Sequence, residues 1–208
     1  MLSILTRSLL LAVVLLTLPQ PVLAAKPGNS NLIIRQRSTG ATSVEVQVGS
    51  SIQVEVFIEG EGEQITGSQV FLTFNDDALE LVPAGFDNQS GLPIPFTSGG
   101  YIRGVPFQNN TINDQIGNSD ANGIPNFQLR YFENISATPF GNPNPATGNG
   151  ALCFFTLRVT RKVAGNSFNI GVDRVSPVGD ETGYFKTGDP GSTYGFRSMQ
   201  TMLIRVKG

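Results

Sequence analysis

Apolar and polar residues alternate along several short segments of this chain, and turn-forming residues separate these segments. In residues 44–48 and 52–58, valine or isoleucine occupies every second position, and a Gly-Ser pair lies between the two runs. A period of two residues is typical of a strand that buries one face. Outside the N-terminal segment, no stretch of ten or more residues has the 3.6-residue spacing of an amphipathic helix. The sequence therefore predicts an all-β protein, built as a single antiparallel β-sandwich.

Three long segments rich in Gly, Pro, Asn and Ser interrupt the alternating runs. Residues 83–123, 136–150 and 177–195 exceed the usual length of a connection and are predicted to be mainly loops. Loops carried on a rigid scaffold are common places for a ligand to bind. The remaining strands are predicted at residues 32–34, 67–74, 79–82, 126–132, 151–162, 168–172 and 199–206.

The N-terminal segment has the pattern of a secretory signal peptide. Arg7 precedes an almost continuous apolar run over residues 8–18, and small residues precede the bond after Ala24. An N-terminal membrane anchor is the alternative, but the run is short for a span. We expect a secreted, extracellular protein with no membrane association after cleavage. The predicted divisions are a signal peptide at 1–24, a flexible leader at 25–31 and a β-sandwich domain at 32–207.

The residue types that are missing exclude several functions. The chain has no histidine and one cysteine, so it lacks the parts of a Ser-His-Asp or Cys-His catalytic system. The formal net charge is -2, and without a basic stripe nucleic acid is not an expected partner. The densest acidic cluster, Asp76, Asp77 and Glu80, occupies one turn and its strand, whereas a glycosidase needs carboxylates facing each other across a cleft. We therefore predict that the protein is not an enzyme.

One loop segment resembles the start of a calcium-binding loop. Asn118, Asp120 and Asn122 place oxygen ligands at alternate positions, and Gly123 follows them. An EF-hand would continue to a bidentate Glu at the twelfth position, where this chain has Leu129. A turn rich in Asn and Asp is the alternative reading. Calcium at these three residues is left open, and no other cofactor is predicted.

Aromatic residues in the loops provide a second set of candidates. Carbohydrate-binding surfaces use exposed aromatic rings as platforms, but the chain has no tryptophan and only four tyrosines. Tyr101, Tyr184 and Tyr194 lie in predicted loop segments and are candidates for stacking on a glycan.

The order of the predicted strands resembles that of cohesin domains, the modules that bind dockerins in cellulosome-type assemblies. The resemblance rests on a Gly-containing turn before an alternating strand at 46–56, and on an alternating strand that ends in an aromatic and acidic turn at 65–82. A Gly-led strand at 150–159 adds to it, and the whole resemblance spans about residues 32–206. It implies a jelly-roll sandwich of about nine strands with long loops, a fold shared with some carbohydrate-binding modules.

The resemblance also implies where a partner binds. In cohesins the dockerin packs on one sheet face, along the strands that match 67–74 and 126–132. The family's acidic residue on the first of these strands is matched here by Gln69, so no known dockerin type is implied. An exposed Phe71 and Phe132 would suit a patch that binds a protein, and the alternative is that one or both turn inward or lie under a loop. The implied face consists of Gln69, Phe71, Thr73, Gln128, Arg130 and Phe132.

The sequence thus predicts a secreted, non-catalytic binding module that recognises a dockerin-type protein partner through a sheet face. Extracellular polysaccharide-degrading assemblies are the expected setting. A carbohydrate-binding module of the same fold, with polysaccharide as its partner, is the first alternative. A structural subunit of an extracellular matrix or filament, assembled by strand exchange at sheet edges, is the second.

Overall fold

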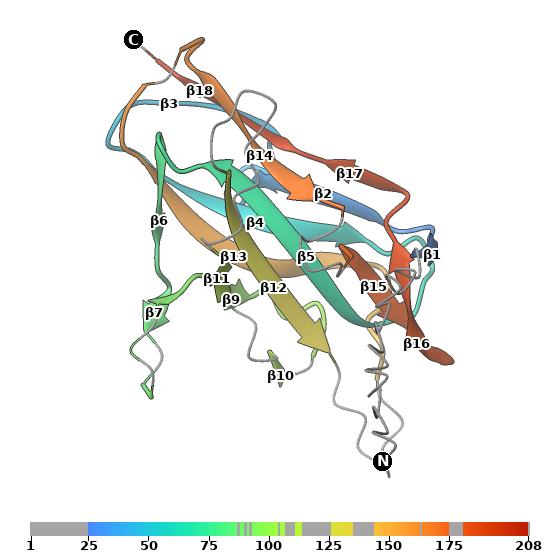
Figure 1. Cartoon of the computed structure of the whole chain (residues 1–208). Helices are drawn as coiled ribbons and strands as arrows, with labels where there is room; N and C mark the ends of the chain where they lie inside the picture. The colour runs from blue at the N-terminus through green and yellow to red at the C-terminus, as the bar shows by residue number, and fades with distance from the viewer. Residues whose placement is uncertain are drawn as a thin grey trace, which may run out of the picture.

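A computed structural model of the chain describes residues 25–86, 88–89, 91, 93–103, 105–106, 111–113, 126–134, 144–162, 164–174 and 181–207, and of residues 105–106, 111–113 and 126–134 the backbone only. Every regular element in this part is a β-strand, and two sheets pack face to face (Figure 1). None of these residues belongs to a helix long and apolar enough to cross a membrane. The predicted signal peptide lies outside the described residues.

The smaller main sheet has six strands. Along its path β2 and β4 lie between β17 and β13, while β6 and β9 both pair with β13. Its strands are β17 (Ser198–Gln200), β2 (Asn31–Gln36), β4 (Ser51–Glu59), β13 (Asn149–Val159), β6 (Leu79–Val82) and β9 (Thr97–Ser98).

The larger sheet has ten strands and is organised around the long strand β5 (Ile65–Asn75). A separate short pair, β7 (Gly85–Phe86) and β8 (Pro93–Ile94), follows β6. The other strands of the large sheet are β1 (Lys26–Pro27), β16 (Asp189–Gly195), β15 (Gly183–Lys186), β14 (Ser167–Asp173), β18 (Met202–Val206), β3 (Ser43–Val46), β12 (Asn126–Asn134), β10 (Val105–Pro106) and β11 (Thr111–Asn113).

The core lies between the two sheets and is built by the alternation seen in the sequence. In β4, Ile52, Val54, Val56 and Ile58 are almost fully buried. Val70, Leu72 and Phe74 of β5 belong to the same apolar cluster. Fully burying one such aliphatic side chain contributes about 1.5–3 kcal/mol, so this paired alternation is the main source of the fold's stability.

Two strand pairs close one edge of the sandwich and make the sheets mixed. The chain leaves the small sheet after β2 and enters the large sheet as β3, and β17 and β18 make the same change with only Thr201 between them. As a result β17 runs parallel to β2, and β18 runs parallel to β3. The predicted all-β sandwich is confirmed, and these parallel pairs add to its mainly antiparallel sheets. Short added strands also raise the described number to 18, against the expected nine or so.

The first described residues, 25–31, are held by hydrogen bonds against the large sheet. β1 pairs in parallel with β16, and the Gly28 amide donates to the Gly195 carbonyl at 3.1 Å. The Asn29 amide donates to the Tyr184 hydroxyl at 2.9 Å, and Lys26 Nζ lies 2.6 Å from Asp189 Oδ2. Residues 25–31, expected to be a flexible leader, thus form an edge strand and the start of β2.

Another difference is in the segment predicted as the third loop. Its described part, 181–195, contains the β-hairpin β15–β16, which turns at Thr187-Gly188 and pairs with β5. Gly188 takes a positive φ of 84° there, which glycine adopts without steric cost. The Gly-rich composition of this segment predicts a turn. It does not predict that the segment pairs with the edge of β5, which lies far away in the sequence.

Candidate functional site

The strand β5 is the centre of the face that the sequence singles out. On one side it pairs with β12 over nine consecutive residue pairs. On its other side the partner changes: β15 pairs with residues 65–69, and β14 pairs with residues 71–73. The change of partner occurs at Val70, in the middle of the strand.

The register brings the six predicted face residues together. Gln69 pairs with Phe132, Phe71 with Arg130, and Thr73 with Gln128. Directly paired residues of antiparallel strands lie on the same face of a sheet. The six positions therefore form one block on two neighbouring strands, as the resemblance implied. Whether this block binds a partner remains a prediction.

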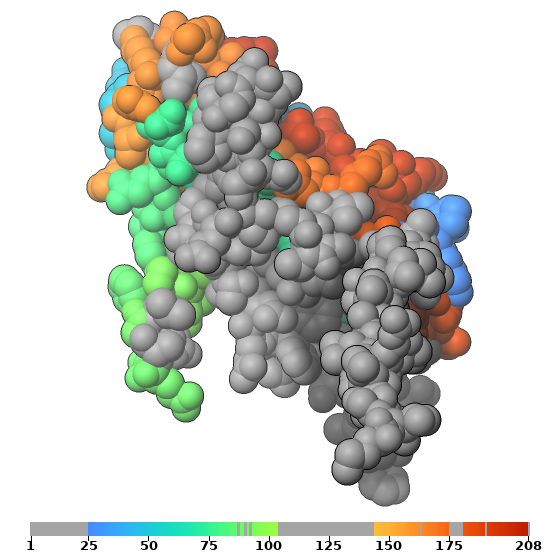
Figure 2. Space-filling view, viewed as in Figure 1, coloured from blue at the N-terminus to red at the C-terminus, as the bar shows by residue number. Residues whose placement is uncertain are grey.

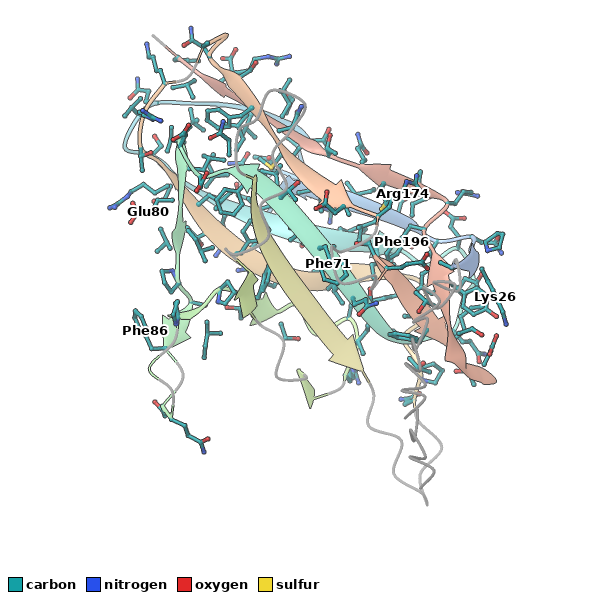
Figure 3. The ribbon with its side chains drawn as sticks, in the orientation of Figure 1. Lys26, Phe71, Glu80, Phe86, Arg174 and Phe196 are labelled. Carbon is teal, nitrogen blue, oxygen red and sulfur yellow. The ribbon has the colours of Figure 1, made fainter. Side chains whose placement is uncertain are left out.

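The exposure of this block differs from the expectation. Phe71 is 1% exposed and Gln69 is 6% exposed, while Thr73 is partly exposed. Phe71 alternates with Val70 and Leu72 and is not part of the core cluster between the sheets. It lies on the outer side of β5 (Figure 3) but is covered there. Of the two alternatives for Phe71, an exposed ring or a covered one, the structure has the covered ring.

The segment that enters β15 is hydrogen-bonded to this part of β5. Gln69 Nε2 donates to the Glu181 carbonyl at 2.6 Å. The backbone amide of Phe71 donates to Thr182 Oγ1 at 3.1 Å, and that hydroxyl in turn donates to the Asp173 carbonyl. Thr182 is 4% exposed, so one buried hydroxyl joins β5 to the end of β14 where the strand partners change. Residues 181–182 thus bind the backbone of β5 at Phe71 and the side chain of Gln69.

Two charged residues lie at the rim of the same face. Asp173 pairs with Phe71 and is partly exposed, and Arg174 beyond it is exposed. Figure 3 shows Arg174 on the same side of the molecule as Phe71. The sequence prediction missed both, because they follow the alternating run at 168–172 and nothing in the pattern marks them.

A projecting hairpin supplies an exposed aromatic ring that the sequence prediction also missed. Phe86 of β7 is 65% exposed, and β7–β8 stands out from the body of the sandwich (Figures 1–3). Beside it is an open groove of about 320 Å³. The groove is lined by Phe74, Asp76, Leu79, Glu80, Leu81, Pro83 and Pro93. Phe74, which faces the core from β5, lies at the inner end of this apolar groove.

The three candidate tyrosines do not form an exposed row. Tyr184 is fully buried and part of the core, so the expectation that it stacks on a glycan is wrong. The Tyr194 ring packs on it at a centroid distance of 6.0 Å, and Lys186 Nζ lies 3.8 Å from the Tyr194 ring centroid. Tyr101 is partly exposed and far from this stack in sequence.

The polar end of Tyr194 belongs to the network that holds β1. Its hydroxyl donates to Asp189 Oδ2 at 2.6 Å, the same oxygen that Lys26 contacts. The hydrogen bond from Lys26, followed by those from Tyr194 and Ser192, lowers the pKa of Asp189 to about 2. Tyr194 therefore has a structural role, with its ring and hydroxyl both occupied.

The predicted calcium ligands Asn118, Asp120 and Asn122 lie outside the described residues. Within the part of the chain that the structure describes, no group of three or more acidic or cysteine side chains is arranged to hold a metal ion.

Solved cohesin modules resemble this structure. A type III cohesin module from the cell-surface anchoring scaffoldin ScaE of Ruminococcus flavefaciens aligns with a TM-score of 0.55 at 14% identity, covering 88% of this chain and 90% of the cohesin. The sixth cohesin of scaffoldin B from Acetivibrio cellulolyticus, solved with a dockerin, aligns with a TM-score of 0.54 at 15% identity, over 86% and 99% of the two chains.

A type I cohesin from Clostridium thermocellum, also solved with a dockerin, gives a TM-score of 0.54 at 10% identity, over 88% of this chain and 96% of that one. No protein-family model matches the chain, and no curated protein matches it in sequence.

The chain has a cohesin-like fold. The coverage extends over nearly all of the cohesin modules, so the shared part is the complete sandwich rather than a fragment. At 10–15% identity the similarity establishes the cohesin-like architecture, and the function has to be argued from the surface of this chain.

Proposed function

We propose that this cohesin-like protein is an extracellular, non-catalytic module that binds a dockerin-bearing protein through the outer face of β5 and β12. The observation that carries the proposal is the β5–β12 register, which brings all six predicted positions into one block on a cohesin-like sandwich. Two of the similar cohesins were solved in complex with dockerins. The signal-peptide pattern supports an extracellular location, and the setting we propose is a polysaccharide-degrading assembly.

The burial of Phe71 and Gln69 changes how this face would work. A residue that is 1% exposed cannot contact a partner, so Phe71 supports the face from beneath. We assign the contacts to Thr73, to the β12 positions Gln128, Arg130 and Phe132, and to the rim. Outside this block, the exposed Phe86 of the projecting β7–β8 hairpin is the strongest aromatic candidate for a contact, because aromatic and arginine side chains dominate the binding energy of protein interfaces.

The acidic cluster of the turn after β5 supports a non-catalytic role. Asp77 Oδ1 forms an ion pair with Arg161 at 2.7 Å, and Glu80 on β6 forms one with Arg158. The Asp77 amide donates to Asn75 Oδ1 at 2.9 Å, an arrangement that stabilises the turn. The carboxylates of Asp77 and Glu80 are thus each paired with an arginine and serve local structure.

The test is binding of purified, calcium-loaded dockerins of types I, II and III, measured by calorimetry with the secreted protein. We expect one of them to bind, and Phe86→Ala to weaken that complex about tenfold or more, as for a moderate interface hot spot. Thermal unfolding of the variant should be unchanged, since Phe86 is mostly exposed.

The matched control is Arg37→Ala, which alters an exposed residue of the opposite, six-stranded sheet and should leave dockerin binding unchanged. Binding of no dockerin would contradict the proposal, and so would equal losses in the two variants. Sequencing of the mature N-terminus in the culture medium tests secretion, with Ala25 expected as the first residue.

A further inference from the structure

A polar cleft lies at the end of the sandwich where β13 begins. It has a volume of about 460 Å³, within the range of about 300–1,000 Å³ that is usual for pockets that bind small ligands. Two segments form it: the chain that follows β9, and the chain that leads into β13 (Figure 1). It is lined by Gly99, Gly100, Tyr101, Arg103, Asn144, Pro145, Ala146, Thr147, Asn149, Gly150 and Ala151.

Tyr101 forms a fixed wall of this cleft. Its ring packs so closely on Gly150 that a β-carbon there would lie 2.5 Å from Tyr101 Cδ2. Its hydroxyl donates to the Gly148 carbonyl at 3.0 Å. Burial raises the pKa of Tyr101 to about 12, so the phenol is neutral at physiological pH. The cleft therefore offers a partly exposed aromatic surface that is held in place before any ligand arrives.

Arg103 gives the cleft its charge. It is exposed, and the described residues provide it with no ion pair or hydrogen bond. In contrast, Arg35 pairs with Glu55 and Arg158 pairs with Glu80. Among the described residues that line the cleft none is acidic, and the Arg103 guanidinium is the single formal charge of this described lining. A planar guanidinium without a partner is suited to bind a carboxylate through two parallel hydrogen bonds.

The other polar groups of the cleft both donate and accept hydrogen bonds. Asn144 and Asn149 provide amides and Thr147 a hydroxyl, and all three residues are exposed. Asn149 Oδ1 already accepts the Gly60 amide at 3.1 Å, which fixes the orientation of that side chain. Groups that donate and accept match a ligand rich in hydroxyls. The absence of a carboxylate from this lining argues against a cation.

We propose that this cleft binds a short acidic oligosaccharide that contains uronic acid. Arg103 takes the sugar carboxylate, the amides and Thr147 take the ring hydroxyls, and Tyr101 packs against the apolar side of one sugar ring. None of the cleft residues belongs to β5 or β12, so the cleft is a second site, separate from the proposed protein-binding face. A protein with both sites would join a partner protein to an acidic polysaccharide.

The experiment is calorimetric titration of the intact protein with trigalacturonate and with its fully methyl-esterified form, which has the same skeleton without charge. We expect saturable binding of the acidic trimer and at least tenfold weaker binding of the ester. Arg103→Gln should weaken binding of trigalacturonate about tenfold and remove the preference for the acid over the ester. A charge-assisted contact of about 1.4 kcal/mol corresponds to that tenfold change in affinity.

The matched control is Arg174→Gln, which removes another exposed arginine that has no ion pair among the described residues. It should leave binding of trigalacturonate unchanged. The proposal is overturned if the wild type shows no saturable binding, if the ester binds as well as the acid, or if the two variants lose affinity equally. Arg103→Gln should retain dockerin binding, so a failure of this site is distinguishable from a failure of the proposed function.

Discussion

The buried hydroxyl of Thr182 is the contact whose removal most directly tests how the β5 face is built. Thr182→Val keeps the shape of the side chain but removes the acceptor for the Phe71 amide and the donor to the Asp173 carbonyl. Phe71 is 1% exposed, so its amide would be left buried without a partner. Such an amide costs about 1–3 kcal/mol, and the second lost hydrogen bond adds about 0.5–1.5 kcal/mol.

We therefore expect Thr182→Val to lower the free energy of unfolding by about 1.5–4.5 kcal/mol. In a domain of this size that corresponds to a fall in Tm of roughly 3–18 °C. Urea unfolding followed by far-UV circular dichroism measures the change, and the slope against urea should stay the same because the fold is unchanged.

Thr97→Val on the exposed side of β9 is the control, and it should shift the free energy of unfolding by less than about 0.5 kcal/mol. A loss below about 0.5 kcal/mol in Thr182→Val would refute the reasoning, because a buried unpaired amide costs more than that. An equal loss in the two variants would also refute it.

Two further changes test the edge where β1, β15 and β16 meet. The hydrogen bond from Lys26 is the main reason that the pKa of Asp189 lies at about 2 rather than 3.8, so its stabilising effect is complete above pH 4 and is lost as the pH falls toward 2. Asp189→Asn should therefore flatten the dependence of the urea midpoint on pH in this window, and an unchanged dependence would contradict the assignment. A β-carbon at Gly183 would lie 2.5 Å from the Tyr194 carbonyl oxygen, so Gly183→Ala should destabilise the protein by about 1–3 kcal/mol. Gly191→Ala on the neighbouring strand meets open space and should change stability by less than about 0.5 kcal/mol, and the same unfolding assay compares the two.

The alternation of side chains allowed the core strands to be predicted from sequence. A strand places successive side chains on opposite faces, so the apolar positions of 52–58 and 70–74 point to the same interior. The hairpin at 183–195 could not be predicted in this way. Its Gly, Asp and Pro residues have weak strand preference, and the hairpin forms because the edge of β5 supplies hydrogen-bond partners.

The position of the candidate face was predictable, but its exposure was not. Alternation assigns Phe71 to the outer side of β5 without showing what covers that side. Thr182, which binds the Phe71 amide, is 111 positions further along the chain, and no local pattern connects the two. Arg103 illustrates the same limit, because the lack of an ion-pair partner is a property of three-dimensional neighbours.

Because of a bulge in β13, the reactivity of the Cys153 thiol can be used to follow the opening of the folded protein. The register shift between Ala151 and Cys153 turns both Leu152 and Cys153 inward, and both are 0% exposed. Cys153 pairs with Val56 of β4 on one side and with Ser98 of the short strand β9 on the other, so a thiol reagent reaches it only when β13 and its neighbours open. With a reagent that reacts faster than the protein recloses, the labelling half-life of an otherwise unmodified chain would then measure the rate of this opening. In an oxidising medium the same burial keeps folded molecules from being cross-linked through sulfur, while molecules that have opened can form covalent dimers.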